Sequence, residues 1–233
     1  MQGPGGLSIR EVIDAGPVLP VVVIEDPSGA VALANALLEG GITVIEITLR
    51  TAGALEAVAR IAEDCPDMIV GTGSVRTPHQ VQQAADAGAR FLVTPGSPQG
   101  LLAACAGSRL PTLPGAATVT EMLTLAERGF SVVKFFPAEQ LGGADALRAI
   151  SGPVPDLDVC PTGGITQYLA ADYLKLPTVP CVGASWVTPA GALREGDWAQ
   201  VRRLARRAQE LRREIQDAEI QDAEIQDAEV LPG

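Results

Sequence analysis

The chain has 233 residues and a net charge of −11, from 17 basic and 28 acidic side chains, so we do not expect nucleic acid as a partner. Hydrophobic residues form 47% of the sequence but aromatic residues only 3%, which predicts one α/β domain with a core of Val, Ile, Leu and Ala. No apolar run approaches the ~20 residues that span a bilayer, and no signal peptide is recognisable, so we expect a cytoplasmic protein without a membrane segment.

Short apolar runs alternate with Ala- and Leu-rich helical segments along the chain. This alternation predicts βαβ units with a parallel sheet, and eight units in roughly 200 residues predict a single (β/α)8 TIM barrel. If the strand at 111–114 or the one at 157–160 did not form, an open doubly wound sheet would be the alternative. The expected strands are 18–24, 43–49, 68–71, 91–94, 111–114, 131–136, 157–160 and 180–183, and the expected helices include 28–39, 53–63, 78–88, 118–128 and 143–150.

Both ends of the chain extend beyond these units. An extra N-terminal helix is expected over about residues 7–15, and an arginine-rich helix over 197–213. The sequence EIQDA then repeats three times, over 214–228, and its five-residue period makes the isoleucines spiral round a helix rather than line one face. The repeat and the residue after it hold seven acids and no base. We predict a non-catalytic acidic tail over 214–233 that is frayed or disordered, and one barrel domain over 1–213.

The side chains that bind metals are scarce and scattered. The only histidine, His79, follows Thr77-Pro78, and the four cysteines contain no CxxC pair. Zinc sites usually need a cluster of His or Cys ligands, and a Ser-His-Asp triad would need His79 at its centre. We therefore expect no metal and no cofactor, a surface position for His79, and reduced, buried cysteines.

The two lysines stand in different surroundings. Lys175 lies in a polar segment, DYLKLP, and is expected to be solvated, whereas Lys134 interrupts an apolar strand, SVVKFFP. Burial favours the neutral amine, which can attack a ketone. The alternative from the residues alone is a structural ion pair.

Two further charges interrupt or close an apolar strand. Glu46 lies within VIEITLR and Arg50 ends it. A carboxylate beside an amine can move protons, and an arginine can hold a substrate carboxylate. A buried salt bridge is the alternative interpretation of Glu46, and the two interpretations are compatible.

Two glycine-bearing loops follow the seventh and eighth expected strands. They are Pro161-Thr162-Gly163-Gly164-Ile165 and Val182-Gly183-Ala184-Ser185-Trp186. Barrel enzymes often bind phosphate between these loops, where backbone N–H groups converge. All these polar residues lie within a strand or just past its C-terminal end, where this fold builds active sites.

These segments resemble the 2-keto-3-deoxy-6-phosphogluconate (KDPG) aldolases, many of which also cleave 4-hydroxy-2-oxoglutarate (KHG). The resemblance extends from about residue 10 to 210. Its motifs are GPVLPVVVI (16–24), EITLRT (46–51), VGTGSV (70–75), TPG (94–96), LPGAAT (113–118), VKFFPAE (133–139), CPTGGI (160–165) and GASW (183–186).

The resemblance implies a homotrimer of (β/α)8 barrels that acts as a class I, Schiff-base aldolase on a phosphorylated 2-keto acid. The expected products are pyruvate and glyceraldehyde 3-phosphate, or pyruvate and glyoxylate from KHG. The implied roles are Schiff-base formation by Lys134, acid/base catalysis by Glu46, carboxylate binding by Arg50 and Ser74, contact with the hydroxylated end of the substrate by Thr162, pocket lining by Pro95 and Phe136, and phosphate binding by Gly163, Gly164 and Ser185.

One departure bears on the substrate. The family usually has threonine where this chain has Ser74, and a small apolar residue where it has Thr72. Carboxylate positioning and substrate preference are the properties that these changes affect.

Two alternatives to this function stay open: the epimeric 2-keto-3-deoxy-6-phosphogalactonate as substrate, or a non-catalytic trimeric scaffold. The EIQDA tail has no counterpart in the family pattern.

Overall fold

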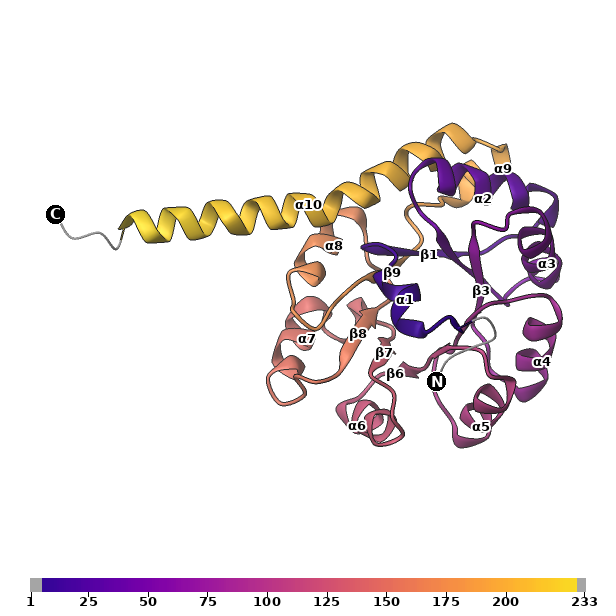
Figure 1. Ribbon diagram of the computed structural model, residues 1–233, viewed down its shortest axis with the longest axis horizontal. Coiled ribbons are helices and arrows are strands. Elements are labelled where there is room, and N and C mark those ends of the chain that lie inside the picture. Colours follow the sequence, from indigo (N-terminus) through magenta and orange to yellow (C-terminus); the bar gives the residue numbers. More distant parts are fainter. Residues whose placement is uncertain (1–5, 230–233) are drawn as a thin grey trace.

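Parallel strands form a closed barrel in the computed structural model, which describes residues 6–229, with few side chains beyond Ile215 (Figure 1). The strands are β1 (Val18–Val22), β2 (Val44–Thr48), β3 (Ile69–Gly73), β4 (Leu92–Val93), β5 (Thr112–Leu113), β6 (Gly115–Ala116), β7 (Val132–Phe135), β8 (Asp158–Pro161) and β9 (Val182–Ala184). Their order is β5-β4-β3-β2-β1-β9 in one sheet and β6-β7-β8 in the other. Each strand thus lies beside its neighbours in sequence, whereas a doubly wound sheet reverses its strand order. The predicted (β/α)8 barrel is confirmed.

The two sheets join at both edges. β5 and β6 are separated only by Pro114, which has no N–H to donate to the ladder. β5 confirms the strand predicted at 111–114, and β6 lies just beyond its predicted end. At the other edge, Thr162 and Gly183 form a parallel bridge between the ends of β8 and β9. β8 itself confirms the strand predicted at 157–160.

Helices surround the strands (Figure 1). Some of them begin at polar caps, as at Thr118, whose hydroxyl and Glu121 form a capping box. The helices are α1 (Ile9–Asp14), α2 (Ala30–Glu39), α3 (Ala54–Asp64), α4 (Pro78–Asp86), α5 (Gln99–Ser108), α6 (Val119–Glu127), α7 (Gly143–Ser151), α8 (Gln167–Leu174), α9 (Ala190–Glu195) and α10 (Trp198–Glu229), with short 3-10 turns η2 (Pro27–Gly29) and η3 (Glu139–Leu141).

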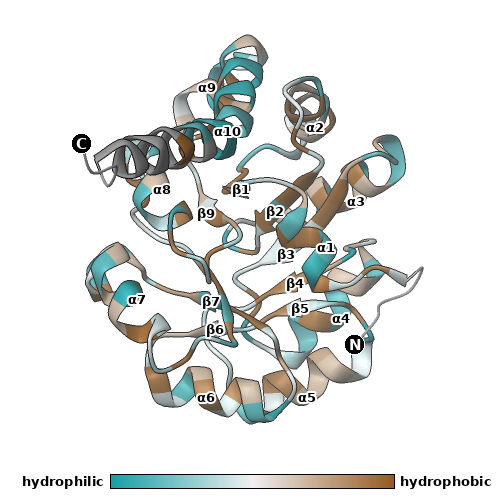
Figure 2. Cartoon of the chain, turned by 60° about the vertical axis from the view of Figure 1, so that its left-hand side comes forward, coloured by the Kyte–Doolittle hydropathy of each residue, from teal (hydrophilic) through white to brown (hydrophobic). Residues whose placement is uncertain are grey.

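Side chains alternate along the strands between the barrel interior and the helices. On β2, Ile45 and Ile47 pack in the layer below the helices, whereas Val44 packs inside the barrel. The interior also holds Phe91, and a Cβ on Gly71 would lie 2.4 Å from its ring, so glycine makes room for this aromatic side chain. Figure 2 shows mainly hydrophobic colours on β2 and mixed colours on α6 and α7, as expected for helices with one solvated face.

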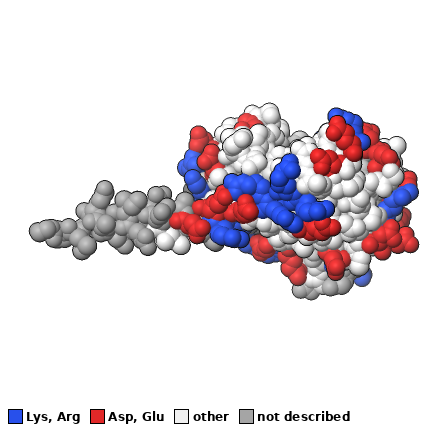
Figure 3. Space-filling model, turned by 90° about the horizontal axis from the view of Figure 1, so that it is seen from above, with Lys and Arg blue, Asp and Glu red and all other residues white. Residues whose placement is uncertain are grey.

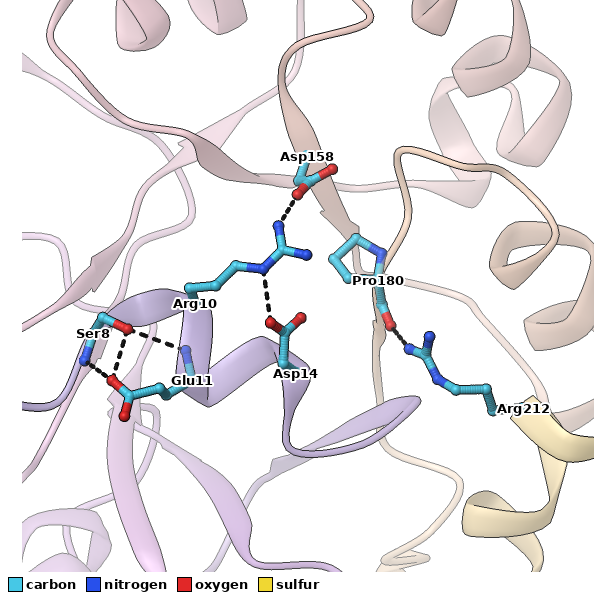
Figure 4. A network of polar contacts seen from close by, with 7 residues as sticks. All are labelled: Ser8, Arg10, Glu11, Asp14, Asp158, Pro180 and Arg212. Atoms are coloured by element: carbon cyan, nitrogen blue, oxygen red, sulfur yellow. Dashed lines mark hydrogen bonds and ion pairs between the residues drawn. The ribbon is translucent and has the colours of Figure 1, made fainter.

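The extra N-terminal helix, α1, closes the end of the barrel where the strands begin. Val12 and Ile13 of α1 belong to the interior cluster with Val44 and Val132, each the first residue of its strand. Arg10 contacts Asp158 at the start of β8, as Figure 4 shows. With this end filled, the C-terminal end of the strands is the one that can hold a site.

The last helix, α10, packs on the barrel and then continues past it. A Cβ on Gly40 would lie 2.3 Å from the Cβ of Ala205, so glycine lets α10 approach the end of α2 closely. Arg212 donates to the Pro180 carbonyl oxygen (Figure 4). Basic and acidic side chains lie side by side where the helix leaves the body (Figure 3), including Arg207 with Glu214.

The helix predicted over 197–213 is confirmed as the first part of α10, but the helical backbone crosses the predicted boundary and continues to Glu229. This differs from the frayed or disordered tail that we expected. Ile215 is 8% exposed and Ile220 is 59% exposed, so these two isoleucines do not share a buried face. The division into a barrel and a non-catalytic tail stays a prediction, and residues 230–233 lie outside the described residues.

Candidate active site

Lys134 and Glu46 face each other inside the barrel. On β7, Val133 and Phe135 pack toward the helices, so Lys134 between them points inward, as Glu46 does on β2. The Lys134 Nζ lies 3.4 Å from the Glu46 Oε1. Lys134 is 5% exposed and Glu46 is 1% exposed, so the pair is largely removed from water. The structure thus brings together two residues that stand 88 positions apart in the sequence.

The space for Glu46 comes from Gly73 at the end of β3. A Cβ on Gly73 would lie 1.8 Å from the Glu46 Oε1, so any other residue would displace the carboxylate. The sequence interpretation did not single out Gly73. The available signal was the GTG segment, whose strand pairs with β2. The other oxygen of Glu46, Oε2, is buried without a hydrogen-bond partner among the described residues. A buried acceptor without a partner is costly, so this oxygen is suited to accept a hydrogen bond from substrate or water.

Phe136 links the lysine to the Gly163-Gly164 loop. The Lys134 Nζ lies 5.6 Å from the centroid of the Phe136 ring, within cation–π range. A Cβ on Gly163 would lie 3.3 Å from the same ring, so the loop backbone packs against it. Phe136 is half-buried and joins Pro137 through a cis peptide. The aromatic ring therefore forms one wall between the amine and the loop after β8.

Arg50 and Ser74 meet beside this pair. The Arg50 Nε donates a hydrogen bond to the Ser74 Oγ at 3.0 Å. Leu49 also donates its N–H to the Gly73 carbonyl oxygen at 2.8 Å, which holds the two loops together. Arg50 is exposed, so its guanidinium can reach a ligand at the mouth of the barrel.

The two departures from the family pattern differ in position. Ser74 has φ of 55°, in the left-handed region, which is costly for a β-branched residue such as threonine. Serine therefore fits this turn with less strain. Thr72 alternates with the inward-facing Gly71 and Gly73 and is fully buried, so it points toward the helices. Its change affects packing behind the sheet rather than the site.

The two glycine-bearing loops lie next to each other. The bridge between Thr162 and Gly183 joins them, and a Cβ on Gly183 would lie 2.2 Å from the Thr162 Oγ1. Gly163 and Gly164 have φ of 107° and 79°, which glycine adopts without strain. Ser185 is exposed two residues after Gly183. The residues expected to hold phosphate thus come from adjacent loops at one end of the barrel.

Pro95 lies one strand away from the lysine. A Cβ on Gly115 would lie 2.4 Å from the Pro95 carbonyl carbon, and Gly115 pairs in register with Lys134. Pro95 is half-buried just beyond β4. It is therefore placed on the β4–β7 side of the same end of the barrel.

The remaining lysine and the histidine stand apart from this site. Lys175 is exposed at the C-cap of α8, and His79 is exposed in the first turn of α4. No group of three or more His, Cys, Asp or Glu side chains suited to a metal ion occurs among the described residues. Over that same part of the chain, none of the helices has the length and apolar character for a membrane span.

A buried lysine beside a buried carboxylate, at the end of a (β/α)8 barrel opposite its closed end, is the arrangement that a lysine-dependent aldolase requires. The model of one aldolase family, described as KDPG and KHG aldolase, matches residues 9–204. The chain belongs to this family.

Individual relatives are similar over most of their length. A 2-dehydro-3-deoxy-phosphogluconate aldolase of Dickeya dadantii is 46% identical over 201 residues, which cover 86% of this chain and 94% of that protein. The KHG/KDPG aldolase of Escherichia coli K12 is 43% identical over 203 residues, covering 87% and 95%. The crystal structure of KDPG aldolase from Legionella pneumophila, with pyruvate captured as a covalent carbinolamine, superimposes with a TM-score of 0.83 at 42% identity, covering 85% and 96%.

Proposed function

We propose that this chain is a class I aldolase that cleaves KDPG into pyruvate and glyceraldehyde 3-phosphate, and that it also splits KHG into pyruvate and glyoxylate. The observation that carries the proposal is the buried contact of 3.4 Å between Lys134 and Glu46. The covalent pyruvate adduct of the Legionella relative supports the same chemistry. No metal or organic cofactor takes part in it.

The proposed reaction begins when the neutral amine of Lys134 attacks the C2 ketone to form a carbinolamine. Glu46 delivers a proton to the departing hydroxyl, which leaves as water, and a protonated imine remains. The same carboxylate, or a water that it holds, then removes the proton of the C4 hydroxyl. The C3–C4 electrons move into the imine, which releases the aldehyde and leaves an enamine. Protonation at C3 and hydrolysis release pyruvate and restore Lys134.

The other residues bind the two ends of the substrate. Arg50 and Ser74 would hold the carboxylate of the pyruvate half, since a guanidinium and a hydroxyl both donate to an anion. Thr162 would contact the hydroxylated end of the substrate, and Pro95 and Phe136 would line the pocket. The phosphate would be bound by the N–H groups of Gly163 and Gly164 and by the hydroxyl of Ser185.

We propose KDPG, the gluconate epimer, as the preferred substrate. Relatives at 40–46% identity carry this activity in their names. A solved structure named for the galactonate enzyme is 24% identical, which supports a common fold alone. A pyruvate assay coupled to lactate dehydrogenase tests this: purified enzyme should release pyruvate from KDPG faster than from the galactonate epimer. The reverse order would shift the assignment to the epimer, and the absence of pyruvate from both substrates and KHG would leave a non-catalytic scaffold.

We expect Ser185→Ala to raise KM for KDPG by about 3- to 10-fold, because one hydrogen bond to a charged phosphate is lost. The unphosphorylated substrate, 2-keto-3-deoxygluconate, offers no phosphate to the exposed Ser185 hydroxyl, so its cleavage should keep its kcat/KM. Steady-state kinetics with both substrates measure the difference. An equal loss on both substrates would contradict a phosphate role for Ser185.

We also propose that the enzyme is a homotrimer and acts in the cytoplasm. The family resemblance supports the trimer. A phosphorylated substrate supports the location, because its charges oppose passage through a bilayer.

The acidic end of α10 is expected to contribute to neither assembly nor cleavage. Truncation after Gln216 keeps the buried Ile215 and removes six of the seven acids of the tail. Because the helix projects away from the barrel (Figure 1), we expect the shortened protein to remain a trimer and to release pyruvate at the rate of the full chain. Light scattering and the coupled assay measure these properties. A folded truncated protein that lost activity, or that changed its mass by more than the deleted segments, would contradict the prediction.

A further inference from the structure

The loop proposed to bind phosphate is fastened to the segment that follows Lys134. The N–H of Ala138 donates to the Thr162 carbonyl oxygen at 2.8 Å, and the N–H of Glu139 donates to the Gly163 carbonyl oxygen at 3.1 Å. These hydrogen bonds continue the pairing of β7 and β8 beyond the ends of the strands. β7, which carries Lys134, and the Gly163-Gly164 loop are therefore held together by backbone hydrogen bonds.

The side chain of Glu139 supports this loop from behind. A Cβ on Gly164 would lie 2.8 Å from both the Cβ and the Cγ of Glu139, so the stem of Glu139 packs directly against the Gly164 backbone. The carboxylate at the end of that stem accepts a hydrogen bond from the hydroxyl of Tyr173. Gly164 has φ of 79°, and no larger residue would fit between these groups. The position of the loop thus depends on where Glu139 is held.

Tyr173 anchors the carboxylate to α8, the helix that begins just after the loop. It is 1% exposed and is among the largest fully buried side chains of the protein. Burial, followed by the hydrogen bond to Glu139, raises the pKa of the Tyr173 hydroxyl above its usual value, so the hydroxyl stays protonated and donates. The glycine loop is consequently held from η3 on one side and from α8 on the other.

The surroundings leave the Glu139 carboxylate dependent on this hydrogen bond. Glu139 and Tyr173 line a hollow of about 450 Å³, together with Asp172 and Arg148. Arg148 is paired with Asp145, and among the described residues Tyr173 is the side-chain donor to Glu139. Without this hydrogen bond the Glu139 side chain would no longer be fixed, and the Gly164 backbone that packs on its stem would lose its support.

We propose that Glu139 and Tyr173 form a clamp that positions the Gly163-Gly164 loop and thereby sets the preference for phosphorylated over unphosphorylated 2-keto acids. Both are positioning residues that act through the loop and not on the reacting atoms. The proposal rests on the proposed function, because it takes this loop as the phosphate site.

The test is Tyr173→Phe, with Tyr168→Phe as its matched control. Tyr168 is the other tyrosine of the chain, lies on the same helix and is 89% exposed. The ratio of kcat/KM for KDPG to that for unphosphorylated 2-keto-3-deoxygluconate should fall by about 10-fold in Tyr173→Phe, because a hydrogen bond to a charged group is lost. The loss should appear in KM for KDPG, with kcat unchanged to within about twofold. Tyr168→Phe should keep the wild-type ratio.

Variants at Glu139 separate a clamp from a packing effect. Glu139→Gln keeps an oxygen that can accept from Tyr173 and should retain most of the preference, whereas Glu139→Ala should lose it as Tyr173→Phe does. The double variant Tyr173→Phe with Glu139→Ala should be no worse than either single one, because both remove the same contact. Equal losses in the Gln and Ala variants, or additive losses in the double variant, would overturn the clamp.

The outcomes also separate the clamp from the phosphate site. If the wild-type enzyme cleaved both substrates equally well, the phosphate site would fail and the clamp with it. If the wild type preferred KDPG and Ser185→Ala reduced that preference, but a folded Tyr173→Phe kept the wild-type ratio, the clamp alone would be overturned.

Discussion

Replacement of Lys134 by arginine is expected to lower kcat for KDPG by about 10⁴-fold or more, which is the order of loss when a covalent nucleophile is removed. Arginine keeps a positive charge beside Glu46, whose Oε1 lies 3.4 Å from the lysine amine. Its guanidinium remains protonated and cannot form an imine. The variant therefore retains a positive charge beside Glu46 but cannot form the imine. Its activity distinguishes a nucleophilic role of Lys134 from a structural salt bridge.

Trapping with borohydride locates the nucleophile directly. In the presence of pyruvate, reduction should leave a stable adduct on Lys134, and peptide mass spectrometry should find it there and not on the exposed Lys175. Lys175→Arg is the matched control and should keep full activity and the adduct. Lys134→Met provides a second inactive variant if the larger arginine disturbs the buried site. An adduct on Lys175 alone, or a fully active Lys134→Arg enzyme, would overturn the mechanism.

The barrel could be predicted because its strands are buried on both faces and therefore appear as continuous apolar runs. The breaks in these runs were equally informative: a lysine and a glutamate inside them predicted a site, and the structure places Lys134 and Glu46 in contact. The end of β5 before Pro114 is explained by the missing N–H of proline, whereas the short strand β6 lies beyond the bounds that the apolar pattern of 111–114 predicted.

Other features depend on contacts between distant segments and were not predicted. The need for glycine at position 73 arises from the carboxylate of Glu46 on the neighbouring strand. Likewise, the hydrogen bond between Glu139 and Tyr173 joins two segments 34 residues apart, and a single sequence contains no local signal for it. The tail differed for another reason: its five-residue period excludes a buried face but does not exclude a helix that continues from α10.

Glu46→Gln is expected to lower kcat by roughly 10²–10⁴-fold, the usual effect of removing a positioned acid/base group. The substitution keeps the shape that fits against Gly73, where a Cβ would lie 1.8 Å from the Glu46 Oε1, so the barrel should remain folded. It also leaves Lys134 in place, so the nucleophile is still present. What disappears is the ability to accept and return a proton at the buried Oε2, which has no other partner among the described residues.

The measurement separates formation of the covalent intermediate from its turnover. Single-turnover experiments with KDPG should show slow release of pyruvate from Glu46→Gln, while borohydride with pyruvate should still trap some adduct on Lys134. In Lys134→Arg both signals should be absent. If Glu46 served only as the counter-ion of Lys134, the glutamine variant would lose that charge but keep the rate of proton transfer, and a folded enzyme with wild-type kcat would establish that role. A large fall in kcat, with KM for KDPG little changed, places the contribution of Glu46 in the transition state, because loss of binding alone would raise KM.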